Sequence, residues 1–195
     1  MNHLAHALLA GPDPLQRVGN VTGDFIKGPL LPLALLPGIR EGVEQHRSID
    51  RFTDDHPLTL EMRRLFAPPY RRYAGILLDV AFDHFLIRHW QAFAPMERHV
   101  FVNETYGLLI THRHELPASL AAAAPRLVAH DWLSRCASWE GVDSTLRGLA
   151  GRLQHDNPLA LAAVEVARNA EPIEQGFLAF FPALMAFAQE LTQTP

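Results

Sequence analysis

Apolar residues recur along most of the chain at three- and four-residue intervals, which is the spacing of an α-helix, and the alternating apolar and polar pattern of strands is missing. Prolines and glycines fall between the periodic segments, where they separate one helix from the next. The pattern predicts helices over residues 2–10, 14–27, 37–54, 57–66, 69–93, 96–115, 118–136, 143–155, 158–169 and 172–191. We therefore expect an all-α fold, a compact helical bundle that forms a single domain over residues 1–195.

Several residues indicate where these helices begin or bend. Pro57 and Pro158 suit the first turn of a helix, and Asp143 suits an N-cap. Pro125 is expected to interrupt its helix and Pro182 to kink the last one, because proline lacks the N–H that a helix interior uses.

Composition narrows the class of protein. The chain has 195 residues, of which 48% are hydrophobic and 19% charged, as in a soluble domain with one core. The single cysteine, Cys136, excludes an internal disulfide and a cysteine-based zinc cluster, so we expect a cytoplasmic protein. The N-terminus lacks the basic start of a secretory signal, and the most apolar window, residues 176–188, is too short to span a bilayer. No membrane association is expected.

Basic residues are concentrated in the first half of the chain, and all but Lys27 are arginine. Because the guanidinium group suits carboxylate and phosphate recognition, this half could dock an acidic partner, although solvated helix faces explain it equally well. The arginines expected to bind a partner are Arg47, Arg51, Arg71 and Arg72. A nucleic-acid-binding surface is normally more basic than this, so we expect no nucleic-acid partner.

The run LDVAFDHFLIRHW, from Leu78 to Trp90, carries polar residues inside a segment that otherwise resembles a buried helix. Asp79 and Asp83 are four residues apart and therefore share one helix face, while His84 lies about 100° round from Asp83. The two carboxylates could pair with an arginine of a neighbouring helix, or they could line a metal pocket.

Two further groups combine histidine with carboxylate. His46, Asp50 and Asp54 follow one another at four-residue intervals, although Asp54 could instead help to end its helix. The other group lies near the N-terminus and comprises His3, His6, Asn20 and Asp24. Of these we expect His3 at the surface.

Carboxylates inside apolar helices need a cation, because an unpaired buried charge is costly. Either the arginines or a metal must supply it. Oxygen-rich ligation with a minority of imidazole suits manganese, magnesium or ferrous iron better than structural zinc. The usual motifs of metalloproteases, P-loop proteins, dinucleotide-binding folds, serine hydrolases and di-iron bundles are missing from the sequence.

Two dipeptides match the adjacent His-Asp that names the HD phosphohydrolases, a class of all-α metal enzymes. They are His130-Asp131 and His155-Asp156. The histidine and aspartate content predicts roughly half a match by chance, so two matches carry little weight. We expect both dipeptides to have structural or surface roles.

A family resemblance rests on a dense set of residues in the first half of the chain. They are Met1-Asn2, Leu4-Ala5-His6, Gly19-Asn20, Asp24-Phe25, Gly28, Gly42, His46-Arg47, Ile49-Asp50, Thr53-Asp54, Pro57, Arg71-Arg72 and the run Leu78–Trp90. In this spacing they resemble the acyl carrier protein phosphodiesterase family, also called acyl carrier protein hydrolases. The resemblance covers roughly residues 1–92 and thins to an aromatic ending at Phe177, Phe180, Phe181 and Pro182. We therefore expect the active site mainly from residues 1–92.

The resemblance implies an enzyme that hydrolyses the phosphodiester joining 4′-phosphopantetheine to a serine of holo acyl carrier protein, giving apo protein. It also implies dependence on manganese and a divergent relation to HD phosphohydrolases, although the adjacent His-Asp is not found at the matching positions. The acidic carrier protein would complement the arginine-rich half.

Site roles follow from that reaction. The expected metal-ligand pool is Asp24, His46, Asp50, Asp79 and Asp83. The expected catalytic residues are His6 and His84 as proton shuttles and Asn20, which would orient water or phosphate. Two alternatives remain open: a related phosphohydrolase acting on a nucleotide or another small phosphodiester, and a non-catalytic helical binding module.

Overall fold

Helices and short 3₁₀ turns make up the part of the chain that the computed structural model describes, residues 3–30 and 33–193, and no strand occurs there. The all-α prediction is therefore confirmed. The α-helices are α1 (His3–Leu9), α2 (Pro14–Thr22), α3 (Pro37–Asp55), α4 (Pro57–Arg63), α5 (Ala74–Arg88), α6 (Trp90–Phe93), α7 (Arg98–Thr111), α8 (Ala118–Ala129), α9 (Trp139–Ala150), α10 (Ala163–Arg168) and α11 (Ala170–Gln193). The 3₁₀ turns are η1 (Gly23–Phe25), η2 (Tyr70–Tyr73), η3 (Arg113–Glu115), η4 (Trp132–Ala137) and η5 (Leu159–Leu161).

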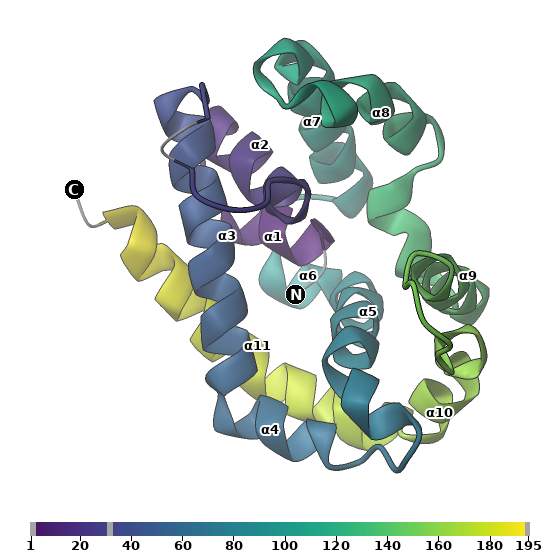
Figure 1. Cartoon of the computed structure of the whole chain (residues 1–195). Helices are drawn as coiled ribbons and strands as arrows, with labels where there is room; N and C mark the ends of the chain where they lie inside the picture. Colours follow the sequence, from purple (N-terminus) through teal and green to yellow (C-terminus); the bar gives the residue numbers. More distant parts are fainter. Residues whose placement is uncertain (1–2, 31–32, 194–195) are drawn as a thin grey trace.

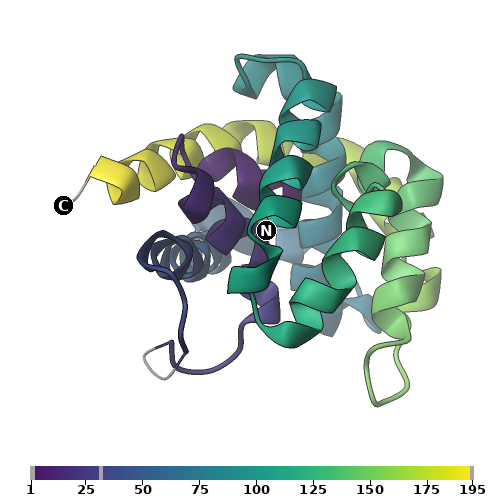
Figure 2. The same ribbon diagram turned by 90° about the horizontal axis from the view of Figure 1, so that it is seen from above.

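The helices surround α5. In Figures 1 and 2, α1 to α3 lie on one side of α5 and α9 and α10 on the other, while α11 runs along the back. Phe82 and Phe85 of α5 and Phe177 and Phe181 of α11 are fully buried, and the rings of Phe82 and Phe177 lie 5.5 Å apart. A helix that is apolar round most of its circumference has to be covered in this way. None of the described helices is both long and apolar enough to cross a membrane.

Two glycines allow α2 and α3 to pack with their backbones in contact. A Cβ added at Gly19 would overlap the carbonyl oxygen of Ile39, and one added at Gly42 would overlap that of Gln16. This close approach brings Asn20 of α2 against α3, and the functional site described below depends on that contact.

Some predicted boundaries differ from those in the structure. Pro57 does begin α4, but Asp143 is not an N-cap: Ser138 caps α9, its hydroxyl oxygen accepting from the Gly141 N–H at 3.2 Å. Serine caps as well as aspartate does, and the helical period already holds from Trp139. The predicted interruption at Pro125 is also wrong, because α8 continues through it.

The other two prolines lie close to their expected places. Pro158 precedes the 3₁₀ turn η5 instead of opening an α-helix, and the segment then continues as α10. Pro182 lies inside α11, which extends past it.

The close packing of α2 on α3 predicts a stability difference between two glycines. We expect Gly42→Ala to lower the free energy of unfolding by about 1–3 kcal/mol, because the added methyl overlaps backbone. Gly107 of α7 is the matched control, since a Cβ there meets no atom within 4 Å; Gly107→Ala should raise stability by about 0.5–1 kcal/mol. Urea denaturation measures both, and a Gly42→Ala protein as stable as wild type would contradict the packing.

Candidate metal centre

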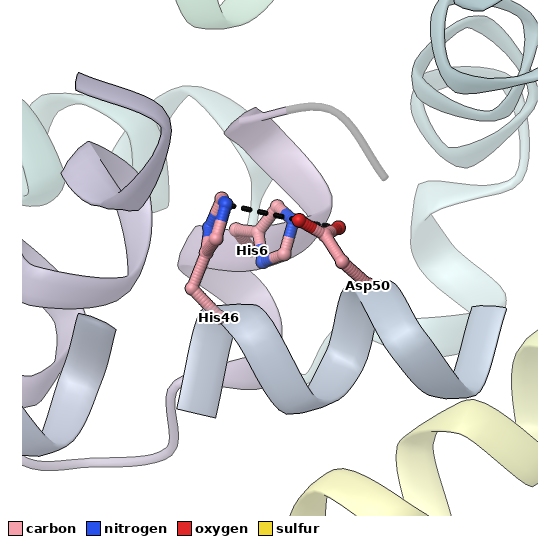
Figure 3. Close-up of side chains that lie close together, drawn as sticks. All are labelled: His6, His46 and Asp50. Carbon is pink, nitrogen blue, oxygen red and sulfur yellow. Dashed lines mark hydrogen bonds and ion pairs between the residues drawn. The ribbon is translucent and has the colours of Figure 1, made fainter. Parts of the chain in front are cut away.

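Two histidines and an aspartate from different parts of the chain meet between α1 and α3 (Figure 3). Nε2 of His6 lies 3.1 Å from Oδ1 of Asp50, and Nε2 of His46 lies 3.1 Å from Oδ2 of the same carboxylate. The two imidazole rings stack with centroids 3.8 Å apart. His46 and Asp50 are four residues apart on α3, whereas His6 comes from α1. One ligand atom from each residue lies within 4.8 Å of the others, which is close enough to hold a single metal ion.

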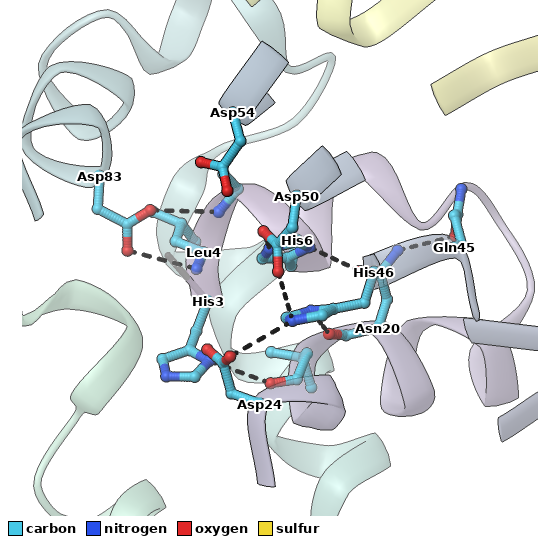
Figure 4. Close-up of polar contacts among 12 residues, drawn as sticks. His3, Leu4, His6, Asn20, Asp24, Gln45, His46, Asp50, Asp54 and Asp83 are labelled. Atoms are coloured by element: carbon cyan, nitrogen blue, oxygen red, sulfur yellow. Dashed lines mark hydrogen bonds and ion pairs between the residues drawn. The ribbon is translucent and has the colours of Figure 1, made fainter. Parts of the chain in front are cut away.

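A chain of buried amides fixes the orientation of His6 (Figure 4). The Gln45 side-chain N–H₂ donates to the carbonyl oxygens of Leu9 at 3.1 Å and Ala188 at 3.4 Å, so the Gln45 side-chain oxygen faces the other way. That oxygen accepts from the Asn20 side-chain N–H₂ at 2.8 Å, which turns Asn20 Oδ1 toward His6 Nδ1 at 2.8 Å. Because Asn20 Oδ1 only accepts, the proton of neutral His6 lies on Nδ1.

His46 is oriented in the same way, because its Nδ1 donates to the backbone oxygen of Asn20 at 2.8 Å. Both rings therefore direct Nε2 at Asp50. A neutral His6 presents a lone pair to the Asp50 carboxylate at 3.1 Å, and a cation between them would turn this repulsion into coordination. Neighbouring ligands of an octahedral ion with bonds of about 2.1 Å are about 3 Å apart, and metal-bound histidines commonly donate their other N–H to a carbonyl. The arrangement fits a divalent metal.

The charges of the metal-free site follow from the same contacts. Although burial opposes the charged form, hydrogen bonds to Asp24 and Asp50 raise the pKa of His46 to about 9. Burial lowers the pKa of His6 to about 3. Although burial opposes the charged form, the hydrogen bond from protonated His46 holds the pKa of Asp50 well below its usual value. Without a metal at neutral pH, His46 carries a proton, His6 is neutral and Asp50 is ionised.

Asp24 joins this centre to a pocket. Its carboxylate lies 3.5 Å from His46 Nε2 and is half-exposed, so it is near enough to become a further ligand. It also lines a pocket of about 490 Å³, together with Asp79 of α5. Burial raises the pKa of Asp79, which is not one of the three residues whose ligand atoms meet between α1 and α3.

Asp83 and His84 contact backbone. Asp83 is 3% exposed and its two oxygens accept from the N–H groups of Leu4 and Ala5, each at 3.4 Å, which anchors the first turn of α1 (Figure 4). Burial raises the pKa of Asp83 to about 7. His84 Nδ1 donates to the Cys136 carbonyl at 2.8 Å, and its ring packs on Trp139. In the structure, Asp83 positions α1, which carries His6, and His84 braces η4.

Comparison with known proteins identifies the family of the chain. The family model described as acyl carrier protein phosphodiesterase matches residues 1–184. Proteins with that name from Yersinia pestis and Yersinia enterocolitica are 34% and 35% identical over 191 and 192 residues, covering 97% of this chain and 98% of each relative. One from Serratia proteamaculans is 32% identical over 192 residues. The chain belongs to the acyl carrier protein phosphodiesterase family. No solved structure matches it.

The four arginines of this phosphodiesterase-family chain that were expected to bind a partner fall into two groups. Arg47 donates to the carbonyl oxygens of Ile26 at 3.0 Å and Gly28 at 2.8 Å and so holds the segment after η1. Arg51, Arg71 and Arg72 are exposed.

Asp54 follows His46 and Asp50 at the same four-residue interval, but it pairs with Arg63 and not with His46 or Asp50.

Sequence reasoning missed two parts of the site. Gln45 lies next to His46 among the buried positions of α3, and a buried glutamine is the signal that could have drawn attention to it. His3 was expected at the surface but is half-buried on the pocket wall, with its ring 4.3 Å from that of Trp132. The dipeptides His130-Asp131 and His155-Asp156 lie outside the centre, and two of their side chains hydrogen-bond to Tyr106 and Tyr73.

The pKa values predict that metal binding releases a proton. At pH 7.5 His46 is protonated and must lose its proton to bind a metal, whereas His6 and Asp50 already lack theirs, so binding of Mn²⁺ should release about one proton. The affinity should rise about tenfold per pH unit between pH 6.5 and 8.5, because the pKa of His46 is about 9. Calorimetry in buffers of different ionisation enthalpy measures this, and binding without proton release would contradict the assignment.

Proposed function

We propose that the chain hydrolyses the phosphodiester between 4′-phosphopantetheine and a serine of holo acyl carrier protein, releasing apo protein, with manganese as its metal. The observation that carries the proposal is the convergence of two imidazole nitrogens and a carboxylate beside a pocket, in a chain of this family. The relatives are named acyl carrier protein phosphodiesterase, and that name supplies the substrate class.

His6, His46 and Asp50 would hold the metal, and Asp24 is the next donor. Two imidazole nitrogens with one carboxylate suit ferrous iron, whereas manganese and magnesium favour oxygen donors. An oxygen of Asp24 would add such a donor for manganese. A bound divalent metal lowers the pKa of its water and neutralises charge on phosphoryl oxygens.

The other residues of the site would position the His6 imidazole and protonate the departing serine oxygen. Asn20 and Gln45 hold the His6 imidazole with Nε2 directed at Asp50. The departing serine oxygen needs a proton. Asp79 lies on the pocket wall with a raised pKa, so it holds a proton nearer neutrality than an ordinary carboxyl does. We assign it the role of general acid, in place of the ligand role suggested by its spacing.

Recognition of the carrier protein would depend on charge. Acyl carrier proteins are acidic, and Arg51, Arg71 and Arg72 leave the first half of the chain with exposed positive charge. Arg47 would contribute to carrier-protein recognition indirectly, because it holds the segment after η1 through the carbonyl oxygens of Ile26 and Gly28.

The proposal predicts loss of activity when Asp50 loses its charge. Wild-type protein with Mn²⁺ should convert holo acyl carrier protein to apo protein, followed by mass spectrometry, and Asp50→Asn should slow this at least about 10³-fold, because the metal contributes several kcal/mol to phosphoryl transfer. Asp55→Asn, an exposed change at the end of α3, is the control and should stay within about twofold.

Other outcomes decide between the alternatives. Turnover of a nucleotide panel without release of apo protein would identify a related phosphohydrolase. Failure to turn over either substrate would identify a binding module and contradict the proposal.

A further inference from the structure

The pocket beside the metal centre is walled by both halves of the chain. Asp24 and Phe25 of η1 and Val80 of α5 form one side, and residues of η4 and α9 form the other, including Trp132 and Leu149. Its volume of about 490 Å³ is within the range of roughly 300–1,000 Å³ that is typical of small-molecule sites. The pocket and the metal centre are contiguous, because Asp24 lines the one and contacts His46 of the other.

The lining combines apolar surface with charged side chains. Side chains of isoleucine, valine, leucine and tryptophan lie with three cationic ones, Lys27, Arg135 and Arg152, and with the carboxylates of Asp24 and Asp79. Within the described part of the chain these three cations make no side-chain hydrogen bond or ion pair, so their charge is available to an anionic ligand. Such a lining suits a narrow molecule that is partly apolar and carries phosphate at one end.

We propose that this pocket binds the 4′-phosphopantetheine arm while the carrier protein stays outside it. The inference rests on the proposed function, and it assigns the two sides of the scissile bond. A folded carrier protein cannot enter 490 Å³, whereas the arm is a single extended chain. Its dimethyl and methylene groups match the apolar wall, and its phosphate, at the end joined to serine, lies beside Asp24 and the metal centre.

Gly148 of α9 offers a way to fill the pocket without disturbing the fold. It lines the pocket, and a Cβ added there meets no atom within 4 Å. Gly107 of α7 is a matched control, a helical glycine with equally open space that lies outside this pocket. Both Gly148→Trp and Gly107→Trp should therefore fold, which thermal denaturation checks.

The test is calorimetric binding of free 4′-phosphopantetheine, the product, to the full chain. Wild type and Gly107→Trp should bind equally within about twofold, and Gly148→Trp should bind about tenfold more weakly or worse. A second pair of variants keeps the test valid if Gly148→Trp does not fold. Arg152→Gln should weaken binding about threefold, whereas Arg126→Gln, at an exposed arginine that does not line the pocket, should leave binding unchanged.

The outcomes separate the two proposals. If wild type releases apo protein but Gly148→Trp and Arg152→Gln bind the product as wild type does, the arm does not use this pocket and the proposed function stands. Absence of binding to wild type would also overturn the pocket assignment. If wild type releases no apo protein from holo acyl carrier protein, the proposed function itself fails.

Discussion

The buried hydrogen-bond chain from Gln45 through Asn20 to His6 is the constraint on which the site depends. It links four helices, because Gln45 lies on α3, Asn20 on α2, His6 on α1, and the Ala188 carbonyl that Gln45 meets on α11. Each amide has one orientation that satisfies all its partners, so the chain fixes which nitrogen of His6 faces Asp50. Buried polar networks that are fully satisfied specify one arrangement of a core. Here that arrangement brings two imidazole nitrogens and a carboxylate close enough to hold a metal ion.

The carboxylates of α5 now have separate explanations. Asp83 holds the first turn of α1 by accepting two backbone N–H groups, and α1 carries His6 toward α3. Asp79 faces the pocket, and His84 fixes the carbonyl of Cys136 in η4, on the opposite wall. A core helix therefore carries polar groups at the three places where it meets α1, the pocket and η4. The four-residue spacing of Asp79 and Asp83 predicted a shared ligand role, and in the structure the helices that cover α5 give the two carboxylates different environments.

Local pattern predicted the helices and part of the site. The four-residue spacing of His46 and Asp50 predicted that their side chains would meet, because both face one side of α3. It could not show that Asp54, one turn later, turns to Arg63, nor that His6 completes the group, since that contact joins residues 44 apart in the chain. The sequence pattern could not predict the pocket either, because part of its wall comes from the distant helix α9. Contacts between distant segments depend on how the helices pack, and the helical periodicity of the sequence does not show which helices pack together.

Anomalous scattering from a crystal soaked in Mn²⁺ tests the central claim most directly. The account predicts a manganese peak bonded at about 2.0–2.3 Å to Nε2 of His6, Nε2 of His46 and an oxygen of Asp50. A strongest peak beside Asp79 or Asp83, with none between the two histidines, would contradict it.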